Sequence, residues 1–266
     1  MVFGNNSDRD WNQFGEDNRY YWVTTFGKYR DDHMTDDRWS EFFAESSSYV
    51  GKLLQTISMH VDPHFRIRRA LDFGCGIGRV SLPLAEVATH VIGLDISDGM
   101  LDEARENSRK QGGENLGFFK SDDDLSAASG TFNFIHSIYV FQHIPFVRGK
   151  AIVKKMLSIL EDGGVLALHF LLSNDLSLRR KVTYWMQVHI PLVKNLLNLR
   201  RRQKWSAPMM QLNSYPLNDL IDLMNAEGCV QYHLRYTKDG RYNGVMILAQ
   251  KKKSESVDFV DLGLIP

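Results

Sequence analysis

The stretch Ala70-Leu71-Asp72-Phe73-Gly74-Cys75-Gly76-Ile77-Gly78-Arg79 decides the fold, because an apolar segment carrying one acid runs directly into three glycines at alternating positions. A chain that leaves a buried strand and enters a helix must turn tightly, and glycine tolerates the backbone angles of such a turn. Residues without Cβ also let a ligand lie against bare backbone. The stretch predicts a strand, a ligand-binding turn and a helix, and an ordinary tight turn without a ligand is the alternative.

The chemistry of this turn favours a ligand other than a dinucleotide. A dinucleotide fingerprint places its third glycine where this chain has Arg79. The carboxylate of Asp72 would repel a pyrophosphate, and it suits a ligand that carries an amine. S-adenosylmethionine has an amino group, a sulfonium and no phosphate, so we expect it as the cofactor.

A second apolar strand strengthens this interpretation and carries a family resemblance. The segment Val91-Ile92-Gly93-Leu94-Asp95-Ile96-Ser97, with Met100 beyond it, follows the glycine turn. Together the two segments resemble class I S-adenosylmethionine-dependent methyltransferases, most closely the branch that modifies small molecules. The resemblance is good over residues 67–172 and loose over 214–250.

The alternation of predicted strands and helices, with short connections, requires a parallel sheet covered by helices on both faces. With the resemblance, this predicts an α/β fold: a Rossmann-like, doubly wound, mostly parallel seven-stranded sheet with an antiparallel C-terminal strand, N-terminal helices and a helical insertion after the fifth strand. The predicted strands cover residues 69–73, 91–95, 116–120, 132–139, 165–170, 230–236 and 242–250. The predicted helices cover residues 36–45, 46–59, 78–88, 99–111, 145–160 and 216–227.

The resemblance also implies a set of cofactor contacts. An acid that closes the second strand accepts the ribose hydroxyls, and this position is Asp95. Ile96 and Met100 sandwich the adenine, although Met100 also suits plain packing. Asp122 receives the adenine amine, with Asp123 beside it, and a solvated loop is the alternative for both. The full predicted set is Asp72, Gly74, Cys75, Gly76, Gly78, Arg79, Asp95, Ile96, Met100, Asp122, Asp123 and Ser137.

Candidate catalytic groups follow the fourth strand, whose end faces the methyl group in the resembling family. Histidine suits general base chemistry at neutral pH, so His143 is the first candidate. Tyr139 is a further candidate, and His169 and Tyr215 are weaker ones. The alternative for His143 is that it fixes its loop by hydrogen bonding. Methyl transfer from a sulfonium requires no metal.

The chain divides into an N-terminal helical cap (residues 1–66), a methyltransferase domain (67–250) and a tail (251–266). Tyr20, Tyr21 and Trp22 in the cap, together with Tyr215, are predicted lid or substrate residues, and packing of the cap is the alternative. Residues 173–213 form a predicted lid insertion. It reads as two short amphipathic helices split at Pro191, and we expect a lid or dimer contact whose apolar side is covered by protein. The alternative, indicated by its apolar content and basic flanks, is peripheral membrane contact through 179–204 or contact with a lipid-like substrate.

Composition limits the partners and the compartment. The chain has 266 residues with 32 basic and 32 acidic side chains, so no global positive field favours nucleic acid. Two cysteines offer no disulfide framework, and we expect a soluble cytoplasmic protein without a signal segment.

The expected function is methylation of a small or amphiphilic acceptor. Enzymes that methylate base amines carry an Asn-Pro-Pro-Tyr type motif after the fourth strand, and this chain has Ser137-Ile138-Tyr139-Val140 there instead. The segment therefore disfavours a methyltransferase that acts on nucleic-acid amines. The alternatives are an RNA or protein methyltransferase, and a non-catalytic scaffold that binds the cofactor.

Overall fold

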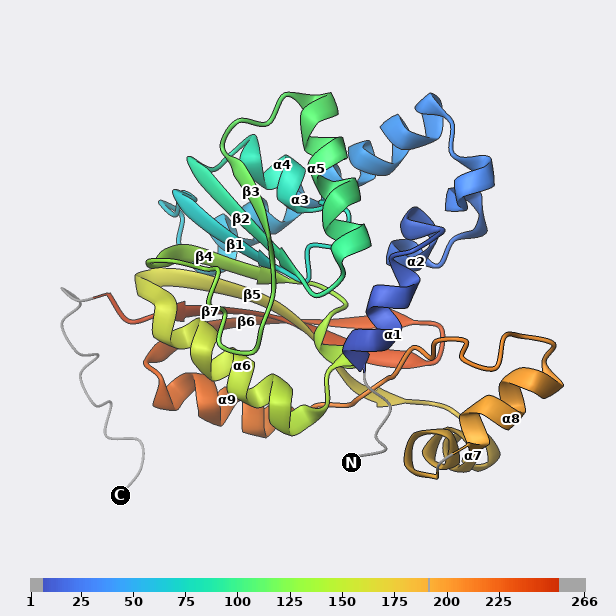
Figure 1. Cartoon of the computed structure of the whole chain (residues 1–266). Helices are drawn as coiled ribbons and strands as arrows, with labels where there is room; N and C mark the ends of the chain where they lie inside the picture. Colours follow the sequence, from blue (N-terminus) through green and yellow to red (C-terminus); the bar gives the residue numbers. More distant parts are fainter. Residues whose placement is uncertain (1–6, 191, 254–266) are drawn as a thin grey trace, which may run out of the picture.

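The computed structural model describes residues 7–190 and 192–253, and these contain a seven-stranded sheet in the order β3-β2-β1-β4-β5-β7-β6 (Figure 1). The first five strands are mutually parallel, and β7 runs antiparallel to both of its neighbours. The predicted fold class is therefore confirmed. The strands are β1 Arg69–Phe73, β2 His90–Asp95, β3 Leu116–Lys120, β4 Phe132–Ser137, β5 Leu160–Asn174, β6 Cys229–Asp239 and β7 Tyr242–Lys251.

Helices cover both faces of the sheet (Figure 1). Successive strand residues point to opposite faces, and accordingly Leu71 belongs to the apolar cluster under α6 and α9, whereas Ala70 belongs to the cluster under α3 and α4. The helices are α1 Ser7–Phe14, α2 Arg19–Thr24, α3 Asp36–His60, α4 Ser81–Ala85, α5 Asp98–Gln111, α6 Phe146–Ile159, α7 Leu178–His189, α8 Val193–Arg200 and α9 Leu217–Ala226. In the described part of the chain, no helix combines the length and apolar character needed to cross a bilayer.

Helix α3 corrects the predicted pair of helices at 36–45 and 46–59, because it runs unbroken from Asp36 to His60. Its N-cap is Thr35, whose hydroxyl accepts from the Arg38 amide at 3.4 Å. Ser46 does not begin a new helix, since its hydroxyl donates back to the carbonyl of Phe42 at 2.9 Å. A short serine run inside a strongly amphipathic segment is thus compatible with one continuous helix.

The glycine turn has the backbone conformation that its sequence predicts. Gly74, Gly76 and Gly78 all have positive φ angles, of 71°, 53° and 82°. A Cβ on Gly74 would overlap the side chain of Val140, which lies against the turn. Because the turn extends through Gly78, helix α4 begins at Ser81 and is shorter than the predicted 78–88.

Two further boundaries differ from the predictions. Strand β4 ends at Ser137 and not at Tyr139, because Tyr139 has a φ of 60° and bends the chain out of the sheet. Strand β5 extends to Asn174 and leads into α7 and α8, the two helices expected in the insertion. Pro191, predicted to split them, lies outside the described residues, as does most of the predicted tail.

Candidate active site

A cavity of about 480 Å³ opens at the carboxyl ends of the parallel strands, where open α/β sheets bind ligands. The glycine turn after β1 contributes Gly74 and Gly76 to its wall. The wall also contains most of the predicted residues from the cap, the cofactor set and the catalytic set: Trp22, Arg79, Asp95, Ile96, Met100, Asp122, Asp123, Tyr139 and His143. The predicted residues outside the wall are Tyr20, Tyr21, Asp72, Cys75, Gly78, Ser137 and Tyr215.

Asp95 links the end of β2 to the glycine turn. Its carboxylate accepts from the backbone N–H of Gly76 at 2.9 Å and from that of Ser97 at 2.8 Å. Burial raises the pKa of Asp95, and the two N–H donors act against that rise. The side chain is therefore held in one orientation at the cavity wall, with acceptor capacity left for a hydroxyl donor.

Asp72 lies beneath the turn and not in the cavity wall. It is buried, and its two oxygens face the Ser81 hydroxyl at 2.5 Å and Nδ1 of His136 at 2.8 Å. The other ring nitrogen of His136 lies 2.9 Å from the Tyr49 hydroxyl. Register explains the contact, because Asp72 and His136 are direct neighbours on β1 and β4. Asp72 thus supports the turn from behind through side-chain partners.

Arg79 brings a positive charge to the cavity. Its Nε donates to the Ser46 hydroxyl at 3.3 Å, and its guanidinium lies 5.2 Å from the ring centre of Phe42. Among the described residues no carboxylate lies within ion-pair distance of it. Burial lowers the pKa of Arg79 from its ordinary value. A half-buried guanidinium without a carboxylate partner is suited to an anionic ligand group.

Asp122 and Asp123 follow β3 at the cavity rim and have different partners. One oxygen of Asp122 accepts from the Ser126 amide at 2.9 Å, which lowers the pKa of Asp122. The carboxylate of Asp123 instead accepts a hydrogen bond from Nε of Arg148 at 2.8 Å. Asp122 therefore caps its own loop and also lines the cavity.

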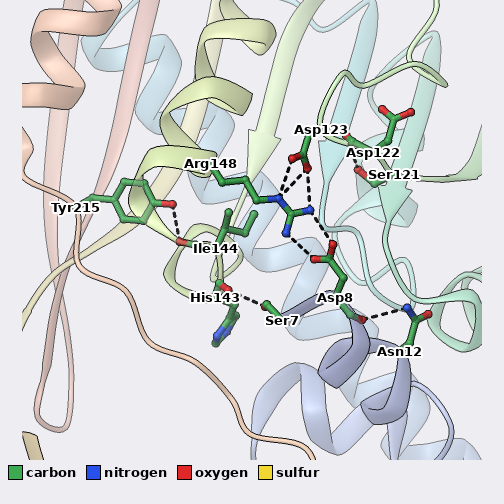
Figure 2. A network of polar contacts seen from close by, with 10 residues as sticks. All are labelled: Ser7, Asp8, Asn12, Ser121, Asp122, Asp123, His143, Ile144, Arg148 and Tyr215. Atoms are coloured by element: carbon green, nitrogen blue, oxygen red, sulfur yellow. Dashed lines mark hydrogen bonds and ion pairs between the residues drawn. The ribbon is translucent and has the colours of Figure 1, made fainter. Parts of the chain in front are cut away.

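Arg148 joins the cavity rim to the N-terminal helix. Besides Asp123, it binds both oxygens of Asp8 on α1, at 2.7 and 2.9 Å (Figure 2). Ser7 adds a hydrogen bond to the carbonyl of His143 at 2.8 Å (Figure 2). Helix α1 is thus fixed over the cavity by a bidentate ion pair, which we call the Arg148 clamp.

His143 lies in the cavity wall with both ring nitrogens engaged. Its Nδ1 is 2.7 Å from the carbonyl of Gln211, and its Nε2 is 3.1 Å from the Gln142 amide nitrogen. A carbonyl only accepts, so Nδ1 carries the proton and Nε2 accepts from Gln142. Burial lowers the pKa of His143 to about 4. The contacts match the loop-fixing alternative more closely than the catalytic one.

His169 on β5 is the histidine of the cavity wall with an unused nitrogen. Its Nε2 lies 2.9 Å from the Thr237 hydroxyl, whereas its buried Nδ1 has no hydrogen-bond partner among the described residues. Burial lowers its pKa to about 4, so the ring is neutral at pH 7. Tyr139 lies against it, with ring centres 4.7 Å apart.

The indole N–H of Trp22 is a second polar group of the wall that is buried without a partner among the described residues. Buried polar groups in native proteins are almost always hydrogen-bonded, so these two groups need a partner such as water or a bound ligand.

Two predicted lid or substrate tyrosines are structural. The Tyr20 hydroxyl bonds Glu103 and Asn107 on α5, each at 2.8 Å, and so anchors α2 to the domain. The Tyr215 hydroxyl donates to the carbonyl of Ile144 at 2.9 Å, and its ring is fully buried in the core. For Tyr20 these contacts match the alternative of packing between the cap and the domain.

The comparisons with known proteins agree with this architecture. Residues 70–164 match a family model described as a methyltransferase domain. The fold resembles magnesium protoporphyrin IX methyltransferase from Synechocystis PCC 6803, solved with bound SAH, with a TM-score of 0.61 and 18% identity over 93% of this chain and all of that one. Residues 70–164 are therefore similar to a methyltransferase domain, and the chain as a whole has the fold of a class I methyltransferase.

Other known proteins are similar to smaller parts of this chain. The YcgJ protein of Bacillus subtilis gives a TM-score of 0.52 and 15% identity over 79% of this chain and 99% of that one. In sequence, a 23S rRNA (uracil(1939)-C(5))-methyltransferase of Marinomonas sp. is 48% identical over 52 residues, which is 20% of this chain. The match spans only 12% of that relative.

Several residues that line or border the cavity have no signal in the sequence. Asp8 and Arg148 are 140 positions apart, and Thr237 reaches His169 from 68 positions away. Such pairs depend on how distant elements pack, so no local motif identifies them. The insertion likewise contributes Met210 and Leu212 to the cavity wall, which its position after β5 indicates only in outline.

Proposed function

We propose that this chain transfers a methyl group from S-adenosylmethionine to a small or amphiphilic acceptor. The observation that carries the proposal is one continuous cavity, in which the glycine turn and Asp95 form one part of the wall and Tyr139 and His169 form another. Its volume of about 480 Å³ falls within the range of small-molecule sites. The domain match and the fold support the same reaction class.

The cofactor half has the groups that this cofactor needs. The glycine turn offers bare backbone to the methionine portion, and Arg79 supplies a positive charge for its carboxylate. Asp95 accepts the ribose hydroxyls, and Met100 and Ile96 border the adenine. When bound, S-adenosylmethionine supplies a methyl group on a positively charged sulfur, so the electrophile is already activated.

The protein therefore acts mainly by orienting the acceptor and excluding water. Helix α1 covers the cavity through the Arg148 clamp. His169 presents a neutral nitrogen that can accept a hydrogen bond from an acceptor hydroxyl or amine and so orient it. The Trp22 N–H donates to a polar atom of the bound ligand. With apolar walls at Met210 and Leu212, this half suits a compact acceptor with few polar groups.

RNA is the second candidate acceptor, because a short segment is 48% identical to an rRNA methyltransferase. A transfer assay with radiolabelled S-adenosylmethionine separates the candidates when small phenols, sugars, quinol-type lipids and structured RNA are compared. Our proposal predicts label in a small or amphiphilic acceptor. Label only in RNA would overturn the acceptor assignment, and saturable cofactor binding without transfer to any acceptor would indicate a scaffold.

A further inference from the structure

Helices α7 and α8 form an arm that projects from the body after β5 (Figure 1). We use the word arm for residues 176–213. Helix α7 contains no buried residue, which is unusual for a helix with so many apolar side chains. The arm therefore presents apolar surface that the described part of the chain leaves uncovered.

This apolar surface is ordered in stripes. On α7, Leu178, Val182 and Trp185 are exposed to 77%, 47% and 54%, at the spacing i, i+4, i+7 that places side chains on one helix face. The same spacing recurs at α8, where Leu192, Leu196 and Leu199 are each more than half exposed. Two stripes of this kind are an outward-facing apolar surface and not scattered exceptions.

The charge of the arm is equally one-sided. Residues 176–218 contain eight lysines and arginines and no acid, in a chain whose basic and acidic side chains are equal in number. Lys194 pairs with Asp10 at 3.0 Å. No ion pair between described residues joins any of the remaining seven to a carboxylate: Arg179, Arg180, Lys181, Arg200, Arg201, Arg202 and Lys204. The arm is thus strongly positively charged, whereas the rest of the chain contains more acidic than basic side chains.

Helix stability does not explain the cations at α7. Arg179, Arg180 and Lys181 occupy its first turn, which holds no acid. The positive end of a helix dipole lies there and disfavours cations. An anionic partner outside the chain would compensate for this unfavourable placement.

We propose that the arm docks onto an anionic lipid bilayer. Exposed aliphatic stripes flanked by lysine and arginine are the combination that binds the interface of an anionic membrane. A surface that binds nucleic acid uses cations and aromatic rings, and this does not explain the five exposed aliphatic side chains of the two stripes. A second copy of the arm would bring like charges together, which opposes self-association.

The arm also reaches the proposed active site. Met210 and Leu212 line the cavity, and the Leu212 amide donates to the Tyr184 hydroxyl of α7 at 2.8 Å. If the proposed function holds, an acceptor that partitions into the bilayer has a short route to the cavity. This consequence narrows the acceptor class to amphiphiles.

Cosedimentation of the full-length protein with vesicles tests the docking without any turnover. We expect binding to vesicles of phosphatidylcholine with phosphatidylserine, weakening in high salt, and at least about tenfold weaker binding to phosphatidylcholine alone. Absence of binding to the anionic vesicles would overturn the proposal. Because no methyl transfer is measured, this failure would leave the proposed function untouched.

Two pairs of variants assign the binding to the arm. The triple variant R179Q/R180Q/K181Q is expected to lose about tenfold or more in vesicle affinity, whereas K52Q/K110Q/K155Q, with the same change in charge on exposed lysines elsewhere, is expected to bind normally. W185S/L196S is expected to bind weakly, and M59S/V230S, which alters equally exposed side chains, normally.

Equal losses in the matched variants would contradict a surface confined to the arm. Tight binding of an RNA oligonucleotide that depends on the arm, without vesicle binding, would assign the surface to nucleic acid. A dimer that W185S/L196S dissociates in analytical ultracentrifugation, again without vesicle binding, would assign it to a second copy.

Discussion

Asp95 tests the cofactor half of the site at a single residue. Its carboxylate already accepts from two backbone N–H groups, so its remaining lone pairs are aimed by the fold. The variant D95N is expected to bind S-adenosylmethionine about 10- to 100-fold more weakly, because it loses hydrogen bonds to a charged acceptor. Equilibrium dialysis with labelled cofactor measures the change. D102N, at a largely exposed acid of α5, serves as the control, and equal affinities for D95N and wild type would refute the ribose assignment.

Substitutions of His169 and His143 are expected to slow methyl transfer to different extents. With the acceptor found in the transfer screen, H169Q is expected to reduce the single-turnover rate about 100-fold while cofactor affinity stays unchanged. H143Q is expected to affect the rate less, because both nitrogens of His143 are used by its own loop. A larger loss of rate in H143Q than in H169Q would reverse the two roles.

His143 makes stability depend on pH. Its pKa of about 4 lies below the ordinary value of 6.5, so the unfolded chain binds more protons than the folded chain between these values. The contribution of neutral His143 to the free energy of unfolding is therefore complete above pH 6.5 and is lost as the pH falls toward 4. When the pH falls from 7 to 5, the free energy of unfolding should thus decrease by about 2 kcal/mol because of His143. Urea denaturation at both pH values, compared with H143Q, measures this share. An unchanged pH dependence in H143Q would contradict it.

Among the elements, α1 depends on side chains that approach from elsewhere in the chain. The Arg148 clamp and the buried Lys194–Asp10 pair attach it to α6 and α8. R148M removes the Arg148 clamp, so the attachment of α1 to the body is expected to weaken by about 1 to 2 kcal/mol. Amide exchange in residues 7–14 should then be about tenfold faster. K154M, at an exposed lysine of the same helix α6, is the control. Unchanged exchange in R148M would mean that other contacts hold α1.

The elements also show how far the sequence predicts this structure. The glycine turn and the strands β1, β2 and β3 follow from local pattern, because burial and backbone angles dictate their residues directly. The division of α3 was wrong, since serines occur inside a helix when its apolar face is otherwise continuous. The Arg148 clamp could not be predicted, because its partners meet only through tertiary packing.

At the scale of the whole molecule, the order of strands brings the functional residues together. The ends of β1 and β2 provide the glycine turn and Asp95, the turn after β4 provides Tyr139, and β5 itself provides His169. The sequence pattern predicts the place of the first group at the ends of strands, and the structure has these residues there. His169 lies within β5, so its orientation toward the cavity became evident only from the sheet.

The central claim is that this cavity binds S-adenosylmethionine, and isothermal titration calorimetry of the wild-type protein with the cofactor tests it most directly. The structure predicts saturable binding to one site per chain, weakened in D95N and unchanged in D102N. Absence of binding by the folded wild-type protein, checked by dialysis against labelled cofactor, would contradict the claim.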